Sequence, residues 1–231
     1  MQRFDLYTHV HKAVRVLLFD AVEIVGRTDF RRAGEIPALA ACVRRMIRLT
    51  RGHAEHEDRE IHPLVHRLAP EVAADLEQGH DRFEGVEREI EKLLVRIENP
   101  LTSSDERVSL GRKVHDMIGP LAADHLTHMA LEEARVNRLL WAHCGDGEIR
   151  EIQGRIIAAI PPHEVGEWIE LMIGAGCLSE RAALLAGMRA TVPADVFAGV
   201  TAAARASVAE SAWSEALQAA DALGAALVER A

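Results

Sequence analysis

Residues 53 to 65 read HAEHEDREIHPLV, and in this stretch His53 stands four residues before Glu57. Residues four apart on a helix lie one above the other on the same face. Residues 128 to 140, HMALEEARVNRLL, repeat the arrangement with His128 and Glu132. The sequence therefore predicts two helices that each present an imidazole and a carboxylate on a single face.

Two further histidines stand in helix-like sequence, His11 in YTHVHKAVRVLL and His80 in LEQGHDRFEGVEREI. Imidazole suits iron, zinc and copper, and a carboxylate can bridge two metal ions through its two oxygens. Four helices that direct such groups toward a shared axis can enclose a pair of ions and leave coordination positions open. The predicted metal ligands are His11, His53, Glu57, His80, His128 and Glu132, with the two carboxylates as bridges.

The order of these ligands resembles that of the hemerythrin-like family, also called the HHE cation-binding domain, over roughly residues 5 to 143. The acidic and apolar residues after each His-x-x-x-Glu pair, and Pro63, are also similar to that family's motif. The resemblance implies a non-haem di-iron centre in a four-helix bundle. Its two iron ions would share an oxo or hydroxo bridge and bridging carboxylates, and zinc or a mixed pair is the alternative.

The third helix departs from the pattern of oxygen-carrying hemerythrins, which have His-x-x-x-His there. In this chain Glu84 follows His80 at that spacing, which disfavours a simple oxygen carrier. Glu84 is either a seventh ligand or a solvated acid, and the simplest expectation for Glu84, Glu87, Glu89 and Glu91 is one solvated face. Tyr7, one turn before His11, either directs its hydroxyl at the metal pocket or packs in the core.

Some histidines compete with the chosen ligands. His9 is the alternative to His11. His125 is the alternative to His128, but Met129 would then take the place of the carboxylate. His56 lies about 60° from the face of His53. The histidines outside the ligand set are expected at the surface or at helix caps: His9, His56, His62, His66, His115, His125, His143 and His163.

Apolar spacing predicts an all-α chain whose short connections make successive helices antiparallel neighbours. The expected helices run from about residue 4 to 25, from 36 to 68, from Pro70 to Asn99, and from Ser103 or Ser104 to near Gly145. Gly119-Pro120 should kink or restart the last of these. The expected architecture is an antiparallel four-helix bundle over residues 1–145, followed by a smaller α-helical appendage of four or five short helices over residues 146–231.

Composition narrows the function classes. A formal net charge of −9 argues against a general nucleic-acid binder, which needs clustered basic residues. Three cysteines without Cys-x-x-Cys spacing favour reduced thiols rather than a disulfide framework. The first residues lack the apolar stretch of a signal peptide, and no run approaches the roughly 20 apolar residues of a membrane span. The expected location is cytoplasmic, without membrane contact.

The resemblance implies a protein that binds or reacts with O₂, peroxide or nitric oxide, in oxygen or redox sensing, iron handling or peroxide removal. If the chain is an enzyme, peroxide disproportionation is the expected reaction. The alternative is a metal- or gas-responsive signalling module without turnover. In that case the helical tail would contact a protein partner or a second copy of the chain.

Overall fold

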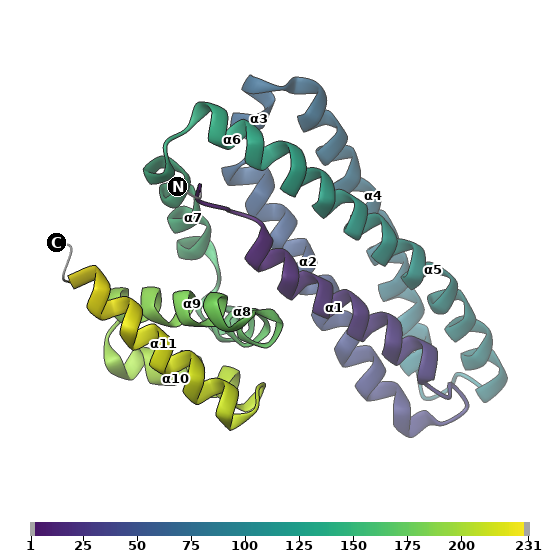
Figure 1. The fold of residues 1–231 in the computed structure, drawn as a ribbon. Coiled ribbons are helices and arrows are strands. Elements are labelled where there is room, and N and C mark those ends of the chain that lie inside the picture. The colour runs from purple at the N-terminus through teal and green to yellow at the C-terminus, as the bar shows by residue number, and fades with distance from the viewer. Residues whose placement is uncertain (1–2, 229–231) are drawn as a thin grey trace. The chain divides into compact units, whose positions relative to one another are not determined.

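The computed structural model describes residues 3–228, and throughout that range the regular elements are helices, with no strand among them (Figure 1). This confirms the predicted all-α class. The chain forms two compact units. The first contains Met1–Tyr7 and Leu17–Ile156, and the second contains Thr8–Val16 and Ile157–Ala231. Helix α1, Thr8–Arg27, therefore contributes residues to both units. Most of helix α7, Asp146–Ala159, lies in the first unit.

The first unit is built on three long helices, of which α4 packs against both α2 and α5 (Figure 1). Its elements after α1 are η1 Ala33–Glu35, α2 Ile36–Glu60, α3 His62–Leu68, α4 Pro70–Glu98, α5 Ser104–Leu131, the π-helical turn η2 Glu132–Val136, α6 Asn137–His143 and α7 Asp146–Ala159. Local sequence signals explain two of the starts. Pro70 occupies the first turn of α4, and the hydroxyl of Ser103 accepts a hydrogen bond from the Glu106 amide at the start of α5.

The structure corrects the predicted helices at two points. The expected single helix over residues 36–68 is interrupted at Ile61, because Pro63 has no N–H with which to continue the helical hydrogen bonds. Gly119-Pro120 was expected to kink or restart the helix, and the second alternative is wrong, since α5 continues through Pro120. Pro120 and Asp116, whose carbonyl loses its helical donor, are both exposed, so water can satisfy that carbonyl.

The core of the first unit is built from apolar residues that recur at helical spacing. On α2 the stripe of Leu39, Val43 and Met46 is fully buried and leads at helical spacing toward His53 and Glu57. A second apolar cluster gathers around the N-terminal segment, α3, the start of α4, α6 and α7. The metal-ligand candidates on α2 thus extend a buried face.

The second unit has its own apolar core, centred on Ile173, Leu185, Ala204 and Trp213. Its helices are α8 Pro162–Ala175, α9 Leu178–Thr191, α10 Ala194–Ala206 and α11 Glu210–Val228. No helix in the described part of the chain is long and apolar enough to cross a membrane. The three cysteines carry free thiols, as predicted.

Candidate metal centre

In each of the two predicted pairs, the imidazole contacts the carboxylate. On α2 the Nε2 atom of His53 lies 3.1 Å from Oε1 of Glu57. At the end of α5 the Nε2 atom of His128 lies 3.2 Å from Oε1 of Glu132. Glu57 is 3% exposed and Glu132 is 0% exposed, so both carboxylates are withdrawn from water. Burying them costs free energy unless cations or hydrogen-bond donors compensate.

His80 of α4 connects the two pairs. Its Nε2 atom lies 2.9 Å from Nε2 of His128 and 3.6 Å from Oε2 of Glu57. Glu57, His80, His128 and Glu132 each offer one ligand atom, and these four atoms lie within 4.8 Å of one another. Three helical segments distant in sequence therefore direct two carboxylates and two imidazoles into one small volume.

The two oxygens of the Glu57 carboxylate face different imidazoles. Its Oε1 faces His53 of its own helix, and its Oε2 faces His80 of α4. Metal–nitrogen and metal–oxygen bonds of about 2.0–2.2 Å place neighbouring ligands of one ion roughly 3 Å apart. The separations in the cluster are close to that value, and the donor types suit first-row metal ions. The residues present therefore suit the binding of a metal ion.

A π-helical turn begins at the ligand candidate Glu132. It spans Glu132–Val136, between α5 and α6. Single π-helical turns inside α-helices are rare and frequently lie at functional sites. No pattern in the sequence indicated this turn. Just beyond it, the side chain of buried Asn137 donates to Asp5 and accepts from the Leu6 amide, which ties the N-terminal segment to α6.

Tyr7 stands at the end of that segment and is 1% exposed. Burial, followed by the negative charges of Glu132 and Glu57, raises its pKa well above the ordinary value of 10.0. The phenol is therefore neutral at physiological pH. Tyr7 packs in the apolar cluster of the first unit, as one of its two predicted roles requires. It also lies close enough to Glu57 and Glu132 for their charges to affect its hydroxyl.

Asp58 and His62 also contact His80. Oδ1 of Asp58 lies 2.9 Å from Nδ1 of His80 and 2.8 Å from Nδ1 of His62. Burial raises the pKa of Asp58, but its interactions with the two histidines outweigh this effect and hold the pKa well below its usual range. Burial lowers the pKa of His80, but Asp58 and Glu57 reverse this and raise it.

His62 is 3% exposed, so its prediction as a surface or capping residue is wrong. It sits where α2 gives way to α3, beside the Pro63 that interrupts the helix. The sequence predicted a continuous helix here, without a break. The burial of the His62 side chain therefore could not be predicted from the sequence.

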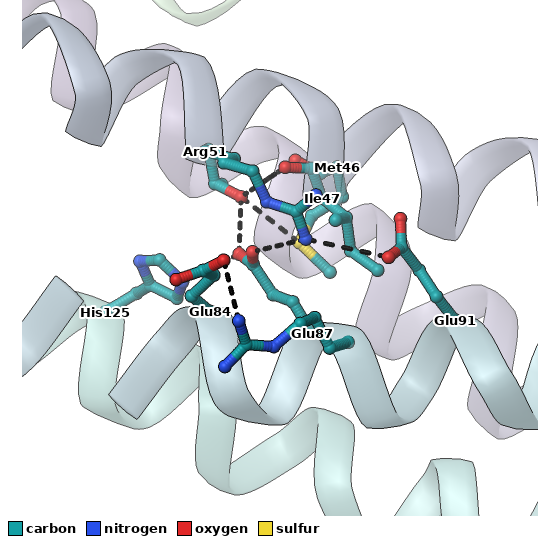
Figure 2. Close-up of polar contacts among 9 residues, drawn as sticks. Met46, Ile47, Arg51, Glu84, Glu87, Glu91 and His125 are labelled. Carbon is teal, nitrogen blue, oxygen red and sulfur yellow. Dashed lines mark hydrogen bonds and ion pairs between the residues drawn. The ribbon is translucent and has the colours of Figure 1, made fainter. Parts of the chain in front are cut away.

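A second buried polar cluster lies on the same helices, around Glu87 (Figure 2). Glu87 is 2% exposed, which contradicts its expected place on a solvated face. Thr50 of α2 donates to Oε1 of Glu87 at 3.0 Å, and Nη2 of Arg51 lies 3.4 Å from Oε2. Glu87 follows His80 by seven residues, about two helical turns, and so shares its inward face.

His125 belongs to this second cluster. Its Nε2 atom lies 3.8 Å from Oε1 of Glu87, and the ring of Phe83 stacks on it at 3.9 Å between centroids. Phe83 meets His128 edge-on at 5.2 Å, so it contacts both imidazoles. His128, rather than His125, therefore accompanies His80, as predicted, although His125 is buried and not at the surface.

The remaining candidates lie outside the four-residue cluster. Glu84 is exposed and accepts a hydrogen bond from Arg88 at 3.0 Å, as a solvated acid would. His11 is fully buried on α1, in the segment Thr8–Val16 that belongs to the second unit. Its part in the centre stays a prediction.

Gly79 makes room for the ligand candidate on α5. A Cβ atom at this position of α4 would lie 2.5 Å from Nδ1 of His128 and 2.9 Å from its Cε1. The imidazole of His128 can occupy its place because residue 79 has no side chain.

Comparisons with protein-family models, with curated proteins and with solved structures find no match to this chain.

Proposed function

We propose that this chain is a hemerythrin-like protein whose residues 1–145 form an antiparallel four-helix bundle around two iron ions. One observation carries the proposal: two buried carboxylates and two imidazoles from separate helical segments offer ligand atoms within 4.8 Å of one another. His53 adds a third imidazole, 3.1 Å from Glu57. Such a cluster of buried acids and imidazoles is expected where metal ions offset the cost of burying the charge.

The proposed reaction class is binding or conversion of O₂, peroxide or nitric oxide. When bound, the two iron ions would supply open coordination positions and change between the ferrous and ferric states. The chain supplies more imidazole than carboxylate, which places less negative charge on the ions and favours their ferrous state. The burial of Glu57 and Glu132 keeps bulk water away and strengthens electrostatic interactions at the centre.

His11 keeps its place in the proposed ligand set on the sequence pattern alone. The His11→Ala variant should bind less iron per chain than the parent. His9→Ala is the matched control, because His9 was the alternative ligand on the same helix. Iron content that falls with His9→Ala and not with His11→Ala would exchange the two assignments.

Iron loading tests the centre itself. The full-length chain should bind two ferrous ions per molecule without air, and after admission of air it should develop the near-ultraviolet absorption of a ferric pair. Glu132→Gln should lower both the iron content and that absorption. Glu84→Gln, which also neutralises one carboxylate, should change neither, because Glu84 is exposed and pairs with Arg88. Equal iron content in parent and Glu132→Gln would contradict the proposal.

Zinc or a mixed pair is the competing composition for the same ligands. Metal analysis of protein purified without added iron decides between them. Zinc in place of iron, together with no absorption change in air, would point to a structural centre.

If the centre is catalytic, the proposed reaction is disproportionation of two hydrogen peroxide molecules to two water molecules and one O₂. One peroxide accepts two electrons and two protons, and the other gives them up. Oxygen release by the iron-loaded chain, measured against Glu132→Gln, tests this reaction.

A signalling role without turnover is the second candidate. The observation that favours it is the separate second unit, which has its own apolar core and contains only His11 of the six proposed ligands. A body of this kind suits contact with a protein partner or with a second copy. Full iron loading with no oxygen release from peroxide would favour this candidate.

A further inference from the structure

We infer that Asp58 is a positioning residue that decides which nitrogen of His80 faces the proposed metal centre. The inference rests on the proposed function and extends it to the ring nitrogen through which His80 would bind the metal. Its evidence is separate from the ligand spacing, because Asp58 is not part of the His-x-x-x-Glu pattern.

The two ring nitrogens of His80 have different partners. Nδ1 lies 2.9 Å from Oδ1 of Asp58, whereas Nε2 lies 3.6 Å from Oε2 of Glu57 and 2.9 Å from Nε2 of His128. Glu57 and Asp58 are consecutive residues of α2, so neighbouring side chains of one helix face the two ring nitrogens of His80 on α4.

An ionised carboxylate can only accept hydrogen bonds. Oδ1 of Asp58 lies at hydrogen-bonding distance from Nδ1 of His80, so this nitrogen is the one that donates. The proton of a neutral His80 is therefore held on Nδ1. Its Nε2 atom then presents a lone pair to the proposed centre, as a metal ligand must.

His62 restrains the plane of the same ring. Its Nδ1 atom lies 2.8 Å from the same Oδ1 atom of Asp58. The rings of His62 and His80 are 5.2 Å apart between centroids and nearly parallel, with an angle of 16°. His62 is 3% exposed and cannot swing away without leaving the core. A single carboxylate oxygen thus orders two stacked imidazoles, one of which is the proposed ligand.

The same three side chains are close enough to bind an ion of their own, which is the rival explanation. The two explanations differ in the number of ions bound. If Asp58 only orients His80, its removal weakens metal binding without changing how many ions saturate the chain. If it is itself a ligand, its removal lowers that number.

The experiment compares the full-length parent with Asp58→Ala, Asp58→Asn and the control Glu55→Ala, using zinc(II) as the probe. Glu55 is an exposed acid on the same helix, so its removal changes the charge equally without touching His80. Zinc affinity is measured by competition with a chelator. Asp58→Ala should bind zinc about 10–100-fold more weakly than the parent, the usual effect of removing a carboxylate that hydrogen-bonds a ligating histidine. Asp58→Asn, which keeps an acceptor oxygen, should lose less.

Nitrogen-15 NMR of the imidazoles gives a second readout that a loss of general stability would not produce. In the metal-free parent, neutral His80 should carry its proton on Nδ1, and in Asp58→Ala it should populate both tautomers. Parent-like affinity and an unchanged tautomer in Asp58→Ala would overturn the inference, as would a lower number of zinc ions at saturation. A parent that binds no metal would instead overturn the proposed function, so the two failures are distinguishable.

Discussion

Gly79→Ala is the most direct perturbation of the proposed centre, because it adds a single methyl group behind the ring of His128. That methyl group would lie 2.5 Å from Nδ1, whereas ordinary contact begins at 3.4 Å. The ring must therefore move by roughly 1 Å, a scale at which misplaced groups lose function. The movement is opposed by Phe83 on the ring's edge and by His80, whose ring centroid is 4.6 Å away.

Two energies of opposite sign decide the stability of Gly79→Ala. Alanine is favoured over glycine inside a helix by about 0.5–1 kcal/mol. Overpacking in a filled interior costs about 1–3 kcal/mol. The metal-free variant should therefore be destabilised by up to about 2.5 kcal/mol. A displaced ligand should also weaken metal binding at least as much as the loss of a hydrogen-bonding neighbour does, by about 10–100-fold.

Gly85→Ala is the matched control. Gly85 lies on the same helix, and a methyl group there meets nothing within 4 Å. It should stabilise the chain by about 0.5–1 kcal/mol and leave metal affinity unchanged. The measurements are urea unfolding of the metal-free chains and zinc competition with a chelator. If Gly79→Ala matches Gly85→Ala in both, the packing of His128 against α4 has been misjudged.

Two further predictions concern buried and partly buried carboxylates. Thr50→Val removes the hydroxyl that donates to Oε1 of Glu87 at 3.0 Å and should cost about 1–3 kcal/mol in urea unfolding, because a buried charge loses a donor. Thr127→Val, an exposed threonine that bonds only its own helix, should cost little, and equal losses would disprove the special role of Glu87. Burial opposes ionisation of Glu180, but the hydrogen bond from Lys12 lowers the pKa of Glu180 from 4.5 to about 2. The ionised Glu180 therefore stabilises the folded chain fully above pH 4.5, and this stabilisation is lost as the pH falls toward 2. After solvent screening, this stabilisation amounts to roughly 1 kcal/mol. Glu180→Gln should therefore lower the melting temperature at pH 7 but not near pH 2. A difference in melting temperature that does not depend on pH would contradict the role given to the ionised Glu180.

Much of the candidate metal centre was predictable from spacing. The helical period places His53 beside Glu57 and His128 beside Glu132 whatever the rest of the chain does, and the structure brings both pairs together with His80. The starts at Pro70 and after Ser103 were predictable for the same reason, because proline and capping residues act on their immediate neighbours.

The predictions failed where a residue's surroundings come from another helix. Glu87 looks like one of several acids on a charged face, and only the approach of Thr50 and Arg51 from α2 makes its burial tolerable. His62 and His125 resemble surface histidines in sequence, yet each packs against an aromatic ring or imidazole of α4.

The sequence by itself determined the helical class, the faces of the helices and the identities of most candidate ligands, since these follow from periodicity along one chain. Only the tertiary structure decided that Asp58 faces the second nitrogen of His80 and that Gly79 accommodates the ring of His128. The physical reason is that both contacts join different helices, whose relative rotation and height are set by the packing of the whole core.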